Sequence, residues 1–176
     1  MVVGYESGNN QILKNIKKGI TKEQAIQFTK DCKKLGLSVH GAFIMGLPGE
    51  NKETIQETIR FAKQLDLNSL QASLASPYPG TEFYTLAKEQ GWIASDDFID
   101  STGHQKCVIN YPNLTNAEIF NSVEEFYDKF YFRPKYILRS IGKMIVDGEE
   151  RRKLLKEGRQ YLAYMRKRKQ GHACES

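Results

Sequence analysis

The sequence predicts an α/β protein, with strands and helices alternating over roughly the first 90 residues and a helical remainder. Two observations lead to this prediction. Short apolar runs, each followed by a turn and a helix-capping residue, recur about every 30 residues, the usual length of a strand–helix–strand unit. After residue 112 the apolar residues recur at helical spacing instead. Three parallel strands with crossover helices are therefore expected in residues 1–95, and a loop followed by basic helices in residues 96–176.

The first repeat begins with a predicted strand at residues 2–6 and a brief helix that Asn9 or Asn10 would cap. A longer helix opens at the capping-box pattern of residues 21–24, in which a Thr hydroxyl and a Gln side chain satisfy each other's free backbone amides. Its expected buried stripe consists of Ala25, Phe28, Cys32 and Leu35. This spacing places Cys32 in the core, where free cysteine is usually found.

The second strand is predicted at residues 37–45 and stops at a Gly/Pro turn, with Asn51 capping the next helix. The apolar face of that helix consists of Ile55, Ile59, Ala62 and Leu65. Alternating apolar and polar residues predict a third strand at 69–75, and Thr81 caps the helix after it. Turns of this kind lie at the carboxyl ends of parallel strands, where α/β folds bind ligands.

The second half begins with a predicted loop at residues 92–112, within which residues 106–110 resemble a short strand. A second capping box at residues 115–118 opens a helix that Arg133-Pro134 ends. The expected buried face of this helix consists of Ile119, Val123, Phe126, Tyr127 and Phe130. Further helices are predicted at residues 136–146 and 149–168.

Composition predicts one core with an appendage, from 176 residues of which 40% are apolar. No apolar run approaches the roughly 20 residues that span a bilayer, and the first residues lack the pattern of a secretory signal. The three cysteines are far apart in the sequence and match no metal or disulfide spacing. A cytoplasmic protein is therefore expected, with His172 and Cys174 in a frayed terminus.

Positive charge is concentrated near the C-terminus. Residues 133–169 contain 13 Lys/Arg and 4 Asp/Glu, against a net charge of +5 for the whole chain. Such a block favours an anionic partner, either a membrane surface or a nucleic acid, although a solvated face of a packed helical subdomain explains it equally well. No motif of a known RNA-binding module accompanies the block, which makes nucleic acid the weaker option.

The predicted sheet also needs a cover. Three parallel strands with crossover helices on one face leave the other face and an edge exposed, and exposed edges invite association. The cover would come from the C-terminal helices, from a chain segment that precedes Met1, or from a partner chain.

Four motifs together resemble the later half of the radical S-adenosylmethionine (SAM) barrel. They are residues 4–8 (GYESG), 13–19 (LKNIKKG), 43–50 (FIMGLPGE) and 77–81 (PYPGT). The resemblance is greatest to the subgroup with an N-terminal cobalamin-binding domain, and within it to hopanoid-biosynthesis-associated members. It covers residues 1–95, and the helical remainder is similar to that subgroup's C-terminal extension.

The resemblance implies a partial TIM-type barrel in which these strands are the fourth, fifth and sixth. In that family a [4Fe-4S] cluster on three cysteines reductively cleaves SAM to a 5′-deoxyadenosyl radical. By the same resemblance, Glu6 and Ser7 would meet the SAM ribose, and Lys18 the methionyl carboxylate. Ile44 would press on the adenine, Gly46 would admit the ligand, and Tyr78 would lie on the rim. Each residue also has a structural interpretation: a strand-end carboxylate, a helix-end lysine, a core isoleucine and a rim aromatic.

Three departures from the family pattern matter. The family's adenine motif usually begins with Gly where this chain has Ala42. The acidic residue follows Gly46 after three positions rather than two, so Glu50 is expected to be a helix N-terminal charge rather than a ligand. The chain also contains no cysteine triplet with three and then two residues between its members. No catalytic or metal-ligating residue is therefore expected in this chain.

The chain is accordingly expected to be the C-terminal portion of a radical SAM enzyme that acts on a hopanoid or another lipid-linked substrate. A missing N-terminal barrel half, or a complementing chain, would supply the cluster, and the parent would also carry any cobalamin. The alternative is a non-catalytic barrel remnant that acts as a docking module with a basic helical tail.

Overall fold

The computed structural model describes residues 1–95, 97–99, 103 and 105–146, together with residues 148, 151–152, 155–156, 158–159 and 163. The chain forms two compact units, residues 1–130 and 131–176. Each unit is described by itself.

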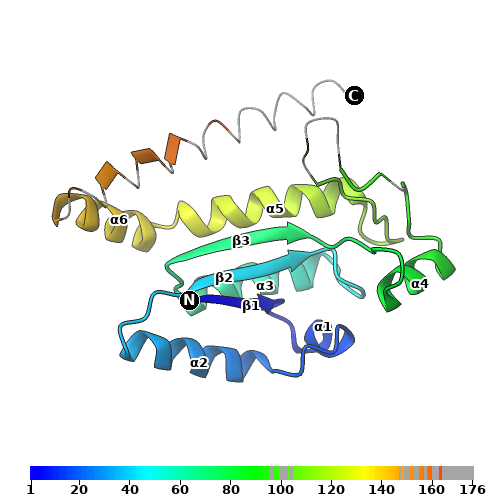
Figure 1. Ribbon diagram of the computed structural model, residues 1–176, viewed down its shortest axis with the longest axis horizontal. Helices are drawn as coiled ribbons and strands as arrows, with labels where there is room; N and C mark the ends of the chain where they lie inside the picture. Colours follow the sequence, from blue (N-terminus) through cyan, green and yellow to red (C-terminus); the bar gives the residue numbers. More distant parts are fainter. Residues whose placement is uncertain are drawn as a thin grey trace. The chain divides into compact units, whose positions relative to one another are not determined.

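The first unit contains a three-stranded parallel sheet in the order β1-β2-β3 (Figure 1). Its elements are β1 (Val2–Glu6), α1 (Asn10–Asn15), α2 (Lys22–Lys34), β2 (His40–Met45), α3 (Lys52–Leu65), β3 (Ser69–Leu74), α4 (Glu82–Glu89) and α5 (Asn116–Tyr131). The predicted α/β alternation is confirmed, and β2 begins three residues later than expected. The caps by Asn9, Thr21, Asn51 and Thr81 are present as predicted.

An aromatic cluster fills the core on one face of the sheet. Tyr5 of β1 stacks on Phe43 of β2 with ring centroids 5.6 Å apart, and Phe61 of α3 meets both rings edge-on. Phe126 of α5 packs against Phe43 at 5.1 Å. The helices α3 and α5 therefore cover the same face of the sheet.

The buried stripe of α2 differs from the prediction. Phe28 and Leu35 are exposed, whereas Thr29 is buried between Ala25 and Cys32. Thr29 tolerates burial because its hydroxyl bonds to the Ala25 carbonyl at 2.7 Å and to the Tyr5 hydroxyl at 2.5 Å. The expected core position of Cys32 is confirmed.

The segment after α4 forms no named strand. Of the residues predicted as a strand at 106–110, Ile109 makes an isolated antiparallel bridge with Ile93. Val108 and Ile109 are nevertheless buried, and backbone bonds from the Ala94 amide to the Val108 carbonyl and from the Asn110 amide to the Trp92 carbonyl, both at 2.8 Å, also hold this loop.

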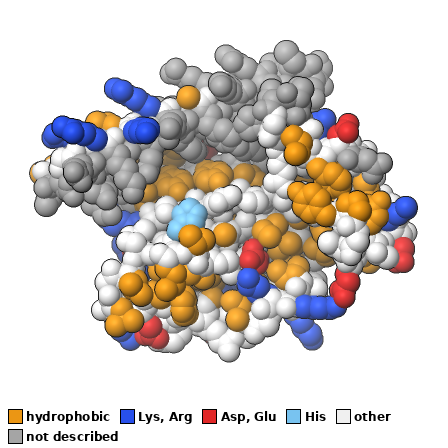
Figure 2. All heavy atoms as spheres, viewed as in Figure 1, with side chains coloured by type: hydrophobic (Ala, Val, Ile, Leu, Met, Phe, Trp, Pro, Cys, Tyr) orange, Lys and Arg blue, Asp and Glu red, His pale blue; other side chains and the backbone are white. Residues whose placement is uncertain are grey.

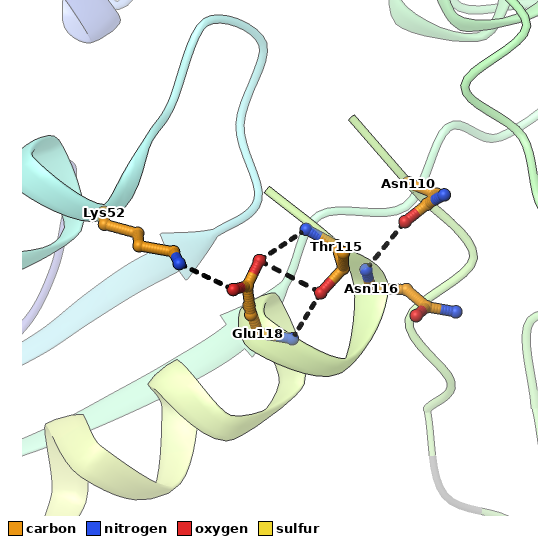
Figure 3. Close-up of polar contacts among 5 residues, drawn as sticks. All are labelled: Lys52, Asn110, Thr115, Asn116 and Glu118. Carbon is orange, nitrogen blue, oxygen red and sulfur yellow. Dashed lines mark hydrogen bonds and ion pairs between the residues drawn. The ribbon is translucent and has the colours of Figure 1, made fainter. Parts of the chain in front are cut away.

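The start of α5 is joined to the start of α3 (Figure 3). Thr115 and Glu118 form the predicted capping box: the Glu118 carboxylate accepts the Thr115 amide at 2.8 Å, and the Thr115 hydroxyl accepts the Glu118 amide at 3.2 Å. The other carboxylate oxygen of Glu118 pairs with Lys52 Nζ at 2.7 Å. One side chain thus caps α5 and links it to α3.

The second unit contains α6 (Pro134–Val146), which begins with proline at its first helical position, as the Arg133-Pro134 break predicts. Most of the helix predicted at 149–168, and both His172 and Cys174, lie outside the described residues. Among the residues that the structure describes, no helix is both long enough and apolar enough to cross a membrane.

Candidate functional site

The two faces of the sheet have different environments. Along β2 the buried residues Gly41, Phe43 and Met45 alternate with the half-buried His40, Ala42 and Ile44. The register sets Ile44 beside Ser73 and Ala42 beside Gln71, so the same open face continues onto β3. Figure 2 shows hydrophobic side chains and a neighbouring acidic and basic pair on the side toward the viewer. The open face is the surface on which a ligand can meet this sheet.

An ion pair lies at the carboxyl end of β1 on this sheet. Lys18 Nζ is 2.8 Å from Glu6 Oε1, and both side chains are mostly shielded from solvent. Glu6 has a φ of 61°, in the left-handed region, and the register with β2 shifts between Gly4 and Glu6. A Cβ on Gly4 would lie 2.5 Å from Glu6 Oε1, so a larger residue there would displace the Glu6 carboxylate from its present position.

The turn at the end of α1 positions Lys18 beside Glu6. Lys17 adopts a φ of 55°, and the Lys18 amide donates to the Leu13 carbonyl at 3.0 Å. This left-handed turn ends α1 and reverses the chain. The side chain of Lys17 instead pairs with the exposed Glu82 at 2.6 Å. Neighbouring lysines therefore have different partners and different exposure.

Ile44 borders a small apolar cluster at the carboxyl ends of the strands. The cluster contains the buried Ile12, Leu47 and Ala75, with Ile16, Ile44 and Phe83 partly buried against it. Ile44 follows Phe43, the residue opposite Glu6 in the register. The structure thus brings Glu6, Lys18 and Ile44 to one end of one sheet.

Ser7 faces the packing between the β1–α1 loop and α3. It is fully buried, its hydroxyl is 3.1 Å from that of Thr58, and it accepts the Asn9 amide at 3.2 Å. The Gly8 amide also donates to Thr58 at 2.9 Å. In this arrangement Ser7 holds the loop that follows Glu6, and a contact with ligand stays a prediction.

The turn after β2 is held by a buried carboxylate. Glu50 Oε2 accepts the amides of Gly46 at 2.7 Å and Leu47 at 3.1 Å, and burial raises the pKa of Glu50 to about 7 despite these bonds. The Tyr111 hydroxyl donates to the Gly46 carbonyl at 2.9 Å. Burial, and then the nearby Glu50, raises the pKa of Tyr111. The carboxylate of Glu50 therefore stabilises the turn after β2. The sequence-based expectation that it acts as a charge at the N-terminus of α3 is wrong.

Gly46 has its own structural requirement. Its φ is 86°, and a Cβ there would lie 2.8 Å from Cγ2 of Ile119 on α5. The geometry accounts for glycine by backbone conformation and by packing against α5. Its predicted role in admitting a ligand stays a prediction.

Tyr78 is exposed and lies after β3, with its ring 5.2 Å from that of Phe98. This places it on a rim segment, as the sequence suggests, while a ligand contact stays a prediction. An open hollow of about 330 Å³ near α4 contains none of the predicted site residues, and is lined by Tyr84, Lys88, Gly91, Ile93, Ala94 and Ser95. The candidate site is therefore defined by the Glu6–Lys18 ion pair and not by this hollow.

Sequence reasoning overlooked His40. Its Nδ1 is 2.8 Å from the Ser69 hydroxyl, on the open face at the amino ends of β2 and β3. The signal that could have found it is the alternation of β2, because His40 has the same parity as Ile44.

The two cysteines that the structure describes do not fit an iron–sulfur cluster. Cys32 is buried in α2, and burial raises the pKa of Cys107 to about 11, which opposes the thiolate that iron binds. Among the described residues, no three His, Cys, Asp or Glu side chains are grouped to hold a metal ion.

Comparison with known proteins relates the sequence of this chain to the radical SAM superfamily. Residues 1–62 match the model of the radical SAM superfamily. The chain is 36% identical over 138 residues to an uncharacterized methyltransferase from Pyrococcus horikoshii, covering 78% of this chain and 30% of that protein. It is 31% identical over 120 residues to cytidylyl-2-hydroxyethylphosphonate methyltransferase from Streptomyces wedmorensis, covering 64% of this chain and 22% of that protein.

The fold also matches a solved radical SAM enzyme. Coproporphyrinogen III oxidase from Escherichia coli superposes with a TM-score of 0.52 at 14% identity, over 75% of this chain and 27% of that one. The three parallel strands thus resemble part of a radical SAM barrel. The chain spans less than a third of the length of each of these three proteins.

Proposed function

We propose, from the relationship of this chain to the radical SAM superfamily, that residues 1–95 form one wall of a SAM-binding site. The observation that carries the proposal is the convergence of Glu6, Lys18 and Ile44 at the carboxyl ends of β1 and β2. These residues place a carboxylate, an ammonium group and an apolar surface close together. In SAM these groups would meet the ribose diol, the methionyl carboxylate and the adenine base, respectively.

Each side chain has a defined task in this proposal. Glu6 accepts hydrogen bonds from the two ribose hydroxyls, because an ionised carboxylate has acceptor sites on both oxygens. Lys18 donates to the methionyl carboxylate as a point charge. Ile44 and its apolar neighbours pack on the adenine ring. The Glu6–Lys18 pair holds both groups in place before the ligand arrives, and the ligand's own charges replace part of that contact.

A [4Fe-4S] cluster, when bound, supplies the electron that cleaves SAM. The two described cysteines do not fit that cluster, and the sequence has no cysteine triplet of the family spacing. We therefore propose that the cluster ligands lie outside residues 1–176, on an N-terminal barrel half or a complementing chain. The open face of the sheet is consistent with a barrel completed by further strands. Cobalamin, where it takes part, would be held there too.

Methyl transfer is the reaction class that we propose for the complete enzyme. Two relatives, each more than 30% identical to this chain over the matched residues, are named as methyltransferases. A third, bacteriochlorophyllide d C-8(2)-methyltransferase from Chlorobaculum tepidum, is 29% identical over 100 residues. A lipid-linked substrate, a hopanoid in particular, stays a prediction from resemblance, since none of these names contains one.

Titration of the isotope-labelled chain with SAM, followed by amide NMR shifts, tests the SAM wall. Saturable shifts are expected at Glu6, Lys18 and Ile44. Lys18→Met is expected to weaken binding roughly 10- to 100-fold, the effect of losing a charge-assisted hydrogen bond. The matched control is Lys17→Met, which removes the neighbouring lysine and its exposed contact with Glu82.

Two outcomes would contradict the proposal: shifts that avoid these residues at saturating SAM, or equal weakening by Lys17→Met and Lys18→Met. A chain that fails to bind SAM but associates stably with an N-terminal barrel half would favour the docking-module alternative.

A further inference from the structure

The second unit presents an apolar stripe that its own helix leaves exposed. Among the α6 side chains that the structure describes, the exposed large apolar residues are Ile137, Leu138, Ile141 and Ile145. Leu138 and Ile145 are 70% and 79% exposed. At about 100° per residue these positions fall within an arc of about 100°, so they form one continuous face along the helix.

The charges of α6 are all of one sign. The sequence from Pro134 to Val146 contains Lys135, Arg139 and Lys143 and lacks Asp and Glu. Lys135 and Arg139 fall outside the apolar arc when the helix is viewed along its axis. The described residues that follow α6 add exposed cations: Arg151, Arg152, Lys156 and Arg159. An apolar face therefore lies beside a cationic face on the same helix.

An amphipathic aromatic side chain stands at the first turn. The Tyr136 ring lies edge-on to Tyr131 at 5.0 Å, and the Arg139 guanidinium is 5.1 Å from its centre. Tyrosine and arginine carry an apolar body and a polar tip, which suits the boundary between hydrocarbon and water.

We propose that α6 binds flat on an anionic lipid bilayer, with the stripe Ile137, Leu138, Ile141 and Ile145 at the acyl boundary and the cations at the headgroups. In this position the apolar face of α6 is buried away from water, and its cationic face contacts negatively charged lipid headgroups. This surface is independent of the SAM wall in residues 1–95.

Two other occupants of this surface, a second copy of the chain and a nucleic acid, fit it less well. A second copy of α6 would cover the stripe but would bring cationic helices together. A nucleic acid would meet the cations but would leave four large apolar side chains in water. An anionic bilayer complements the charge and the apolar stripe at once.

Cosedimentation of the full chain with vesicles tests the proposal. The probes are vesicles of phosphatidylcholine alone and of phosphatidylcholine mixed with phosphatidylglycerol. Binding is expected only to the anionic vesicles, and it should weaken as salt rises. Leu138→Gln combined with Ile145→Gln should weaken binding at least tenfold, because two apolar side chains lose their burial. Lys135→Gln combined with Arg139→Gln should weaken it roughly tenfold or more.

The matched control is Phe28→Gln combined with Leu35→Gln on α2, which also removes two exposed large apolar residues. This control should bind vesicles as the unaltered chain does. Circular dichroism checks that each variant keeps its helix content. The proposal fails if neutral vesicles bind equally well, if no vesicle binds at low salt, or if the α2 control loses as much binding as the α6 variant. Dimerisation that the α6 apolar variant abolishes, or retention on single-stranded RNA without vesicle binding, would assign the surface to the other occupants.

Discussion

Replacing Glu50 by glutamine should remove most of the pH dependence of folding stability near neutrality. Glu50 is 2% exposed, and while Oε2 accepts two backbone amides, Oε1 has no hydrogen-bond partner among the described residues. Burial disfavours the ionised form more than those two bonds favour it. The folded chain therefore retains a proton on Glu50 at pH values where the unfolded chain has released it.

The magnitude follows from the pKa. The value rises from an ordinary 4.5 to about 7 in the folded chain. Each tenfold change in proton affinity is worth about 1.4 kcal/mol, so the folded state loses about 3 kcal/mol of stability as pH rises from 4.5 through 7. The contribution is fully present below pH 4.5, because both states are protonated there. This is a large share of the 5 to 15 kcal/mol that a typical domain has.

Urea unfolding of the chain and of Glu50→Gln, followed by circular dichroism, measures this effect. Glutamine keeps the shape of the protonated side chain and cannot ionise, so any cost of its buried amide group is the same at every pH. The unaltered chain should lose about 3 kcal/mol relative to the variant between about pH 4.5 and pH 8. Glu53→Gln, which removes an exposed carboxylate from the first turn of α3, is the control. A stability difference that stays constant over this range would refute the reasoning, because Glu50 would then be ionised in the folded chain at an ordinary pKa.

Two further predictions concern the same part of the fold. The hydrogen bond from Lys52, followed by those from Thr115, lowers the pKa of Glu118 to about 2, so its charge stabilises the fold above pH 4.5 and this contribution is lost as pH falls toward 2. Glu118→Gln should therefore be less stable at neutral pH and should show a weaker loss between those two pH values in an acid titration followed by circular dichroism. Gly46→Ala should cost about 2 to 4 kcal/mol in urea unfolding, against about 1 kcal/mol for Gly80→Ala, which has a similar φ but open space around it; equal costs would mean that contact with α5 is unimportant.

Element boundaries were predictable where the signal is local. Thr21, Asn51 and Thr81 satisfy amides within their own first turn, so sequence alone locates the helix starts. The buried face of α2 was not predictable, because the burial of Thr29 depends on a hydroxyl from β1, 24 residues away. From sequence alone, a polar residue whose hydrogen-bond partner is distant in the chain is predicted to be solvent-exposed.

The same distinction explains the candidate site. Local rules account for where Ile44 and Lys18 lie, because strand alternation and a helix-ending turn place them. Their ligand roles come from the family resemblance and stay predictions. The burial of Ser7 and Glu50 could not, since it arises from Thr58 on α3 and from packing around the β2 turn. In both cases the side chain beside a predicted ligand residue serves to hold the loop that presents it.

The two edges of the sheet bear on how the fold is completed. At the outer edge of β3, the Ala72 amide donates to the Tyr127 hydroxyl at 3.0 Å, and the Leu74 carbonyl accepts Gln105 Nε2 at 2.9 Å. These side chains from α5 and the preceding loop use backbone groups that a fourth strand would need. At the other edge, β1 has β2 as its one strand neighbour among the described residues. A strand that extends this sheet must therefore add beside β1, next to Glu6 and Lys18. The edge available for the rest of a barrel is the edge that presents the proposed SAM ligands, so completing the barrel and completing the SAM site would be the same event.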